Sequence, residues 1–198
     1  MSERLPQVWL VRHGETAWSL TGQHTGRADI PLTERGEQEA RLLADRLRGK
    51  SFAAVFNSPL RRAVRTCELA GFGASSVTDP DLTEWNYGAY EGRTRAEIRA
   101  QRPGWSLFRD GCPGGESLAE MGARADRVVA RVRAVTGDVL LFSHGHLLRF
   151  VAARWLSLPP DGARLFHLTT ASVSIRSYEH EIDQPVFRLW NDDHHIRG

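Results

Sequence analysis

The residues best suited to chemistry in this sequence are arginines and histidines that directly follow short apolar segments. Arg12 and His13 follow the first segment, and Arg62 lies shortly after the second. His144 follows a later one. Near neutral pH an imidazole can act as a nucleophile or as an acid or base, and a guanidinium can bind phosphate oxygens through two N–H groups. A single residue of either type is more often structural or solvated. The functional interpretation therefore rests on the position that these residues share, after short apolar segments.

The apolar segments that precede these residues are predicted to be buried strands of one sheet. They cover residues 7–11, 52–56 and 138–142, and each ends abruptly in polar residues, which is typical of buried parallel strands. In open α/β sheets, ligands bind outside the carboxyl ends of the strands. The three segments are therefore expected to bring their polar residues to one crevice.

Strands and helices alternate along most of the chain. Further strands are predicted over residues 76–78, 171–178 and 185–190, and helices over residues 34–48, 60–70, 95–101, 118–135 and 147–156. A long functional loop is expected over 16–32, an irregular stretch over 102–115 and a mobile tail from residue 192. The alternation predicts a three-layer α/β/α sandwich with a mostly parallel central sheet, in a single domain over residues 1–198.

Composition and charge are those of an ordinary globular protein. The chain has 198 residues, of which 41% are hydrophobic and 25% charged, and a formal net charge of +2. This charge is too small to predict binding to nucleic acid or to an anionic membrane, and no apolar run approaches the roughly 20 residues of a membrane-spanning helix. Cys67 and Cys112 lack a metal-binding spacing, so we expect free thiols in a cytoplasmic protein.

Five segments resemble, in order, the motifs of the histidine phosphatase superfamily, which includes the cofactor-dependent phosphoglycerate mutases. They are Arg12-His13-Gly14-Glu15-Thr16, Ser58-Pro59-Leu60-Arg61-Arg62-Ala63 with Thr66, Leu82-Thr83-Glu84-Trp85-Asn86-Tyr87-Gly88 with Glu91-Gly92, Gly115-Glu116-Ser117 with Arg124, and Ser143-His144-Gly145. The resemblance runs from residue 8 to about residue 156 and covers most of the chain. It implies the phosphoglycerate mutase-like form of the sandwich.

The resemblance also implies a covalent phosphohistidine formed on His13. As a neutral imidazole, His13 would attack the phosphoryl group. Arg12, Arg62 and His144 would surround the phosphoryl oxygens. Glu84 would give a proton to the leaving oxygen and then take one from the attacking water. On this basis we expect neither a metal nor a cofactor.

Five further residues are expected to bind the substrate. Backbone amides of Thr25 and Gly26 would add to the phosphate cage, while Tyr87, Gly145 and His146 would line the pocket. Two interpretations stay open for arginines of the predicted lid, namely contact with a second anionic group or a solvated helix face. These arginines are Arg95, Arg99, Arg102 and Arg109.

The predicted function is hydrolysis of small phosphate monoesters, including sugar phosphates. In the resemblance, mutases carry a longer insertion between the acid motif and the second histidine, whereas the segment 84–144 is comparatively short here. Residues 22–26 and 109–115 look more like a branch of acid and sugar-phosphate phosphatases that includes sedoheptulose-bisphosphatase-like proteins. A mutase is the alternative, and an inactive phosphate-sensing module is a more distant one. The expected partner is a small phosphorylated metabolite, with no nucleic acid and no membrane, and a homodimer is left open.

Overall fold

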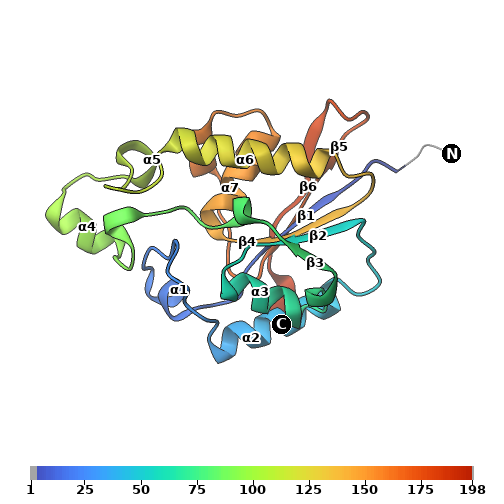
Figure 1. Cartoon of the computed structure of the whole chain (residues 1–198), viewed down its shortest axis with the longest axis horizontal. Coiled ribbons are helices and arrows are strands. Elements are labelled where there is room, and N and C mark those ends of the chain that lie inside the picture. Colours follow the sequence, from blue (N-terminus) through green and yellow to red (C-terminus); the bar gives the residue numbers. More distant parts are fainter. Residues whose placement is uncertain (1–3, 198) are drawn as a thin grey trace.

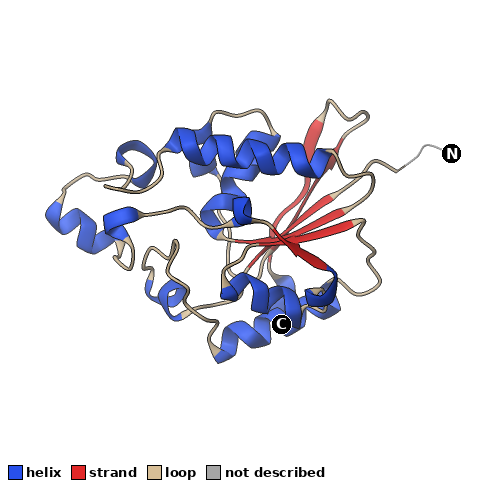
Figure 2. Cartoon of the chain, viewed as in Figure 1, coloured by secondary structure: helices blue, strands red, loops and turns tan. Residues whose placement is uncertain are grey.

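A computed structural model describes residues 4–197 and contains one six-stranded sheet with helices on both faces (Figure 1, Figure 2). The strands are β1 (Val8–Arg12), β2 (Ala54–Asn57), β3 (Ser76–Thr78), β4 (Val139–Ser143), β5 (Val173–Tyr178) and β6 (Pro185–Asp192). Their order is β3-β2-β4-β1-β5-β6, and only β5 runs against the others. The predicted α/β sandwich with a mostly parallel sheet is confirmed.

Two groups of helices enclose the sheet. The α-helices are α1 (Ala17–Thr21), α2 (Glu34–Arg46), α3 (Arg61–Leu69), α4 (Arg95–Gln101), α5 (Leu107–Asp110), α6 (Leu118–Arg133), α7 (Gly145–Trp155) and α8 (His194–Arg197). Short 3₁₀ helices are η1 (Gly73–Ser75), η2 (Pro80–Leu82), η3 (Gly88–Tyr90) and η4 (Pro160–Leu165). In Figure 1, α2, α3 and α8 cover one face of the sheet, and α6 and α7 cover the other.

The longer elements follow directly from caps and apolar patterns in the sequence. Thr33 accepts a hydrogen bond from the Gly36 N–H and begins α2, and Ser117 forms a capping box with Glu120 at the start of α6. All five residues of β4 are buried, as expected for a central parallel strand. The strand β3 and the helix α4 span the predicted residues, and the other predicted bounds differ by one or two residues.

The predicted loop 16–32, the predicted irregular stretch 102–115 and the predicted mobile tail each contain a short helix. Within 16–32, α1 begins at a capping box between Thr16 and Ser19. Within 102–115, Asp110 accepts the Ser106 N–H, which closes α5. The prediction of a mobile tail is also wrong, because Asp192 ends β6 and pairs with Arg46, 3.0 Å away. Helices of four or five residues are too short to show a hydrophobic period, and the tail is held by contacts with remote residues, among them Arg46, Thr169 and Ala171, so local patterns miss both.

Strands from both ends of the chain share this sheet. The central strand β1 comes from the start of the chain, and β5 and β6 come from its end. Residues 1–3 and 198, which the single-domain prediction includes, lie outside the described residues. Within residues 4–197 no helix is long and apolar enough to cross a membrane.

Candidate active site

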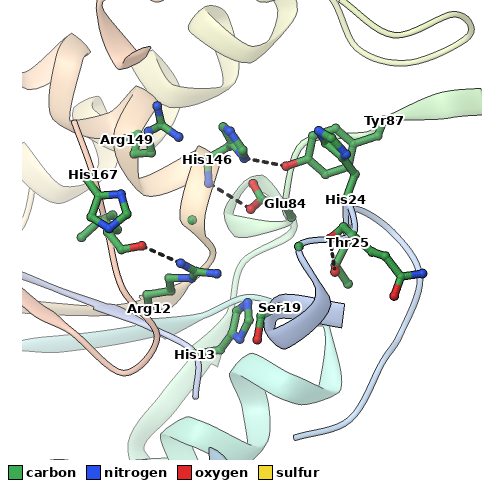
Figure 3. A pocket seen from close by; sticks show the side chains of 14 residues that line it. Arg12, His13, Ser19, His24, Thr25, Glu84, Tyr87, His146, Arg149 and His167 are labelled. Carbon is green, nitrogen blue, oxygen red and sulfur yellow. Dashed lines mark hydrogen bonds between the residues drawn. The ribbon is translucent and has the colours of Figure 1, made fainter. Parts of the chain in front are cut away.

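A cavity of about 240 Å³ lies where β1 and β4 end (Figure 3). Its wall also includes the segment 19–25, the first turn of α7 and residues 167–168. Seven of the predicted site residues line it, namely Arg12, His13, Thr25, Glu84, Tyr87, Gly145 and His146. The convergence expected from the strand ends is therefore present for β1 and β4, whereas no residue of the segment after β2 lines the cavity.

His13 is held between two strands by its own backbone. Its N–H donates to the Ser143 carbonyl at the end of β4, and its carbonyl accepts the N–H of Ala171 just before β5, both at 3.0 Å. The ring Nδ1 lies 2.7 Å from the Gly14 carbonyl oxygen, which can only accept, so Nδ1 carries the proton and Nε2 the lone pair. Burial, followed by the charges of Arg62 and Arg12, lowers the pKa of His13 well below its usual value. His13 is thus a neutral imidazole with a basic Nε2.

Two glycines allow the turn after His13 to pack against the start of α2. A β-carbon on Gly14 would collide with the Gly36 carbonyl oxygen, and one on Gly36 would collide with that of Glu15. The Gly14 N–H donates to Thr66 Oγ1 on α3, at 3.1 Å. The turn that carries the imidazole is therefore fixed from α2 and from α3.

Arg12 supplies the positive charge nearest the end of β1. Its Nη1 donates to the Leu168 carbonyl at 2.6 Å, and its Nε is buried with no hydrogen-bond partner among the described residues. A β-carbon on Gly145 would lie 3.4 Å from the Arg12 guanidinium, an ordinary van der Waals contact, so residue 145 packs directly against Arg12. Burial lowers the pKa of Arg12, although nearby Glu84 and Tyr87 oppose the shift. A buried cation with an unused donor is suited to an anionic ligand.

Glu84 lies against the first turn of α7. Its Oε1 accepts the N–H groups of Trp85 at 2.8 Å and Leu147 at 2.9 Å, and its Oε2 accepts the His146 N–H at 2.9 Å. The N-terminus of a helix offers unpaired N–H groups and a partial positive charge, both of which hold a carboxylate. Glu84 is thereby fixed at the wall of the cavity that holds His13.

The backbone that carries Glu84 is clamped from behind by a buried ion pair. Arg124, on α6, donates to the carbonyls of Asp81 at 3.0 Å, Thr83 and Glu84. Its guanidinium is also paired with Glu116, at 2.9 Å through Nε and 2.7 Å through Nη2. Because one planar cation binds three carbonyls of this segment, Arg124 and Glu116 set the position of Glu84.

Tyr87 and His146 form a second polar wall (Figure 3). The Tyr87 hydroxyl lies 2.6 Å from His146 Nδ1. Burial raises the pKa of Tyr87 well above its usual value, and burial followed by the charge of Arg149 lowers the pKa of His146. The neutral phenol therefore donates to the neutral imidazole, and the remaining ring proton of His146 is on Nε2.

Arg62 and His144 lie behind the cavity instead of lining it, which corrects the predicted cage. Arg62 Nε donates to His144 Nδ1 at 3.1 Å, so the His144 proton is on Nε2, which donates to Ser58 Oγ at 2.7 Å. The remaining guanidinium N–H groups of Arg62 bind backbone carbonyls of the segment 25–28. The rings of His13 and His144 are nevertheless only 5.1 Å apart between centroids. Arg62 and His144 thus form a fully buried layer behind His13, and the His144 ring contacts the His13 ring.

Gly26 also differs from the expectation that its amide binds the phosphoryl group. Its N–H donates to Glu91 Oε1 at 2.7 Å, and its carbonyl accepts from Arg62 at 2.8 Å. A β-carbon at 26 would collide with the Trp85 carbonyl oxygen and with Glu91. Gly26 is thus a packing position, whereas its neighbour Thr25 does line the cavity.

Seven residues of the cavity wall are not among the predicted site residues. They are His24, Arg149 and His167, whose side chains are ionisable, and Ser19, Gly22, Gln23 and Leu168. Arg149 follows Gly145 by four residues on α7 and so shares its helix face, a spacing that could have identified it. His24 donates through Nδ1 to the Arg93 carbonyl at 2.7 Å. His167 precedes no strand or motif, so nothing local marks it.

The four lid arginines lie outside the cavity lining. Arg99 donates to the Trp105 carbonyl at 2.9 Å, and Arg109 pairs with Asp110 at 2.8 Å. Arg102 lies 3.9 Å from the same carboxylate. Of the two open interpretations, the solvated helix face agrees with these contacts.

Within residues 4–197 no three His, Cys, Asp or Glu side chains are grouped as metal ligands. Cys67 and Cys112 are free, and burial raises their pKa to about 11 and about 12. Neither thiol is a reactive thiolate near neutral pH.

Comparison with known proteins places this geometry in a family. The model of the histidine phosphatase superfamily (branch 1) matches residues 8–193. An acid phosphatase of Mycobacterium tuberculosis is 42% identical over 189 residues, covering 93% of this chain and 92% of that protein. Sedoheptulose 1,7-bisphosphatase of Saccharomyces cerevisiae is 34% identical, covering 96% of this chain and 86% of that protein.

Two further matches complete the comparison. A probable phosphoglycerate mutase of Photorhabdus laumondii is 34% identical, with 88% of this chain and 86% of that protein covered. A solved structure of an open reading frame from M. tuberculosis superposes with a TM-score of 0.88 at 38% identity, covering 95% of this chain and 98% of that one. The chain belongs to the histidine phosphatase superfamily.

Proposed function

We propose that this chain is a phosphatase that hydrolyses small phosphate monoesters through a phosphohistidine on His13. One observation carries the proposal: a neutral imidazole with its lone pair on Nε2 lines the same cavity as the Arg12 guanidinium and the Glu84 carboxylate. These are a nucleophile, an anion-binding group and a proton donor or acceptor.

In the first step His13 Nε2 attacks phosphorus and the bond from phosphorus to the ester oxygen breaks. The leaving oxygen takes a proton from Glu84, so the products are the alcohol and the phosphoenzyme. Oε1 of Glu84 already accepts two N–H groups, whereas Oε2 accepts one among the described residues. Oε2 therefore has the lone pair that carries this proton.

In the second step water attacks the phosphohistidine. The Glu84 carboxylate takes a proton from that water, the N–P bond breaks, and His13 returns to its neutral form as phosphate is released. Arg12 at the wall and Arg62 behind His13 supply positive charge to the phosphoryl oxygens. The same two charges contribute to the lowered pKa of His13, so they act at the position of the imidazole.

The rest of the cavity supports an ester whose alcohol part carries a second polar or anionic group. Arg149 and His167 lie beyond Arg12, away from His13, and His24 faces them across the opening (Figure 3). A guanidinium at this place binds a carboxylate or a second phosphate better than an apolar alcohol. Sugar phosphates and phosphorylated acids fit both this chemistry and the cavity of about 240 Å³.

A mutase is the second candidate, because one relative is named a probable phosphoglycerate mutase. The higher identity to an acid phosphatase and the match to a bisphosphatase over most of the chain support hydrolysis. An inactive phosphate-sensing module is disfavoured, because His13, Arg12 and Glu84 are all present in the cavity.

The test is a panel of phosphate esters assayed for free phosphate, with phosphoenzyme trapped by an alkaline quench. We expect acid-labile phosphate on the wild type and none on His13→Ala, whose turnover should fall to background. His194→Ala, at an exposed histidine, is the matched control and should behave as the wild type. Normal turnover by His13→Ala would overturn the mechanism. Rapid isomerisation of 3-phosphoglycerate with a bisphosphoglycerate primer, and little free phosphate, would favour the mutase.

For the location of the protein we propose the cytoplasm. Cys67 and Cys112 are both free thiols, which is the usual state of cysteines in a reducing compartment.

A further inference from the structure

The segment 25–28 is bound from both sides by opposite charges. On one side the Glu91 carboxylate accepts the N–H of Gly26 at 2.7 Å and of Ala28 at 3.1 Å, both through Oε1. On the other side the Arg62 guanidinium donates to the carbonyls of the same two residues, each at 2.8 Å. The carbonyl of Thr25 is a third acceptor of Arg62, at 3.2 Å. Each of the two shared residues thus gives its N–H to the anion and its C=O to the cation.

The neighbouring residues of the same segment are also tied to the chain around Glu91. His24 exchanges backbone hydrogen bonds with Arg93 and Gly92, at 2.9 Å and 2.8 Å. Gln23 pairs with Thr94 as an isolated β-bridge. The segment 23–28 therefore takes its position from residues 91–94, and it presents His24 and Thr25 to the cavity.

Arg62 in turn fixes the layer behind the nucleophile. Its Nε binds His144, and this contact sets the tautomer in which His144 donates to Ser58. The charge of Arg62 is one of the causes that lower the pKa of His13. The orientation of Arg62 depends on three backbone carbonyls, because the guanidinium has no carboxylate within salt-bridge distance among the described residues.

From these contacts we infer that Glu91 is a positioning residue for phosphate binding, and that it acts through the segment 25–28 on Arg62. Glu91 itself lies outside the cavity lining and touches no reacting group. Glu91 holds the N–H groups of Gly26 and Ala28 and so fixes the direction of the carbonyls of these two residues. These carbonyls in turn orient the Arg62 guanidinium toward His144 and His13. The inference rests on the proposed function only in taking phosphate as the ligand of this cavity.

The experiment measures the affinity for inorganic phosphate by calorimetry in Glu91→Ala and Glu91→Gln. We expect Glu91→Ala to weaken phosphate binding by roughly 10- to 100-fold, the range found when outer partners of metal ligands are removed. Glu91→Gln keeps one oxygen for both N–H groups and should recover most of the loss, to within about fivefold of the wild type. Glu97→Ala is the matched control, because Glu97 caps α4 on the same segment and does not touch residues 25–28. It should bind phosphate as the wild type does.

If Glu91 acts through Arg62, variants at both residues provide a second and sharper test. In an Arg62→Ala background, adding Glu91→Ala should change neither phosphate affinity nor kcat/KM for an aryl phosphate by more than about twofold, since coupled residues do not add. Full additivity would overturn the inference, as would wild-type phosphate affinity in Glu91→Ala. If Glu91→Ala does not fold, the same cycle is run with Glu91→Gln, whose smaller loss should vanish when Arg62 is absent.

These experiments distinguish failure of the proposed function from failure of the inference about Glu91, because phosphate binding can be measured without turnover. A chain that binds phosphate and hydrolyses no ester would remove the proposed function and leave the inference standing. Unchanged phosphate affinity in Glu91→Ala, with normal hydrolysis, would remove the inference alone.

Discussion

Glu84 and His146 are joined by a hydrogen bond of 2.9 Å, from the backbone N–H in the first turn of α7 to the carboxylate Oε2. Oε1 is occupied by two other N–H groups, from Trp85 and Leu147. A glutamine at this position has one oxygen and one NH₂ group, so at least one N–H of the protein would face another donor. The carboxylate is therefore needed for the position of this side chain, in addition to the proton transfers proposed for it.

Glu84→Gln should slow hydrolysis of alkyl phosphates by about 10²–10⁴-fold, the usual effect of losing a positioned acid or base. An activated aryl phosphate needs little protonation of its leaving group, so its first step should suffer less. Dephosphorylation would then limit turnover, and rapid-quench kinetics should show a burst of phenol. An equal loss on both classes of ester, without a burst, would contradict the role of Glu84.

Arg124→Met should impair the same step without touching the cavity. The variant leaves Glu116 without its cation and the carbonyls of residues 81–84 without a shared donor, which should reduce the free energy of unfolding by about 3 kcal/mol. Because Glu84 loses its support, alkyl phosphates should be affected more than aryl phosphates. Arg127→Met is the control, since its exposed pair with Asp81 should contribute less than about 1 kcal/mol. If Arg124→Met hydrolysed alkyl and aryl phosphates in the same ratio of rates as the wild type, the prediction would be contradicted.

The pH dependence follows from three histidines whose pKa values burial lowers well below the usual range, namely the buried His13 and His144 and the half-buried His146. Above about pH 6.5 the imidazoles are neutral in both folded and unfolded chains, so their full contribution to stability is present. Below that pH the unfolded chain binds protons that the folded chain excludes, and the free energy of unfolding should fall by about 1.4 kcal/mol per histidine per pH unit.

Denaturation at several pH values between about 5 and 8 measures how steeply the free energy of unfolding depends on pH. His144→Gln should reduce this slope by the contribution of one histidine. Since His13 stays neutral in the folded chain, kcat/KM for an aryl phosphate should persist below pH 6.5. Loss of half the activity at the ordinary histidine pKa would show that the nucleophile is not shielded.

Removal of divalent metals should leave kcat/KM within about twofold of its starting value. The charge of the phosphoryl group is met by Arg12 at the wall and Arg62 behind it, and the proton transfers are assigned to Glu84. The measurement is activity after dialysis against a chelator, with a metal-dependent phosphatase in parallel. Loss of activity that returns on adding magnesium, manganese or zinc would contradict the prediction.

Much of the fold could be predicted because its long elements carry their own signals. The buried strand β4 and the capped helix α6 show clear apolar patterns, and both were found within two residues. The short helices α1 and α5 depend on side-chain hydrogen bonds to the backbone beside them, a capping box for α1 and the Ser106–Asp110 bond for α5, and these leave no periodic pattern.

The residues of the candidate site also differ in how far the sequence could predict their positions. The position of His13, at the end of β1, follows from motif and topology, and that of Glu84, in the loop after η2, follows from motif alone. The position of Arg62 could not be predicted, because its partners are backbone carbonyls of a remote loop, and any residue type supplies a carbonyl. Arg149 was overlooked although its helical spacing from Gly145 was visible, whereas no local pattern marks His167.

The backbone pairing of His13 with Ser143 and Ala171 has a consequence for how this architecture can diversify. The nucleophile belongs to the hydrogen-bonded frame of three strands, so it can open only when the centre of the sheet opens. His24 and His167, on two other sides of the cavity, belong to connecting segments whose side chains can be exchanged without disturbing that frame. New leaving groups can therefore be accommodated by surface substitutions while the chemical step is inherited unchanged.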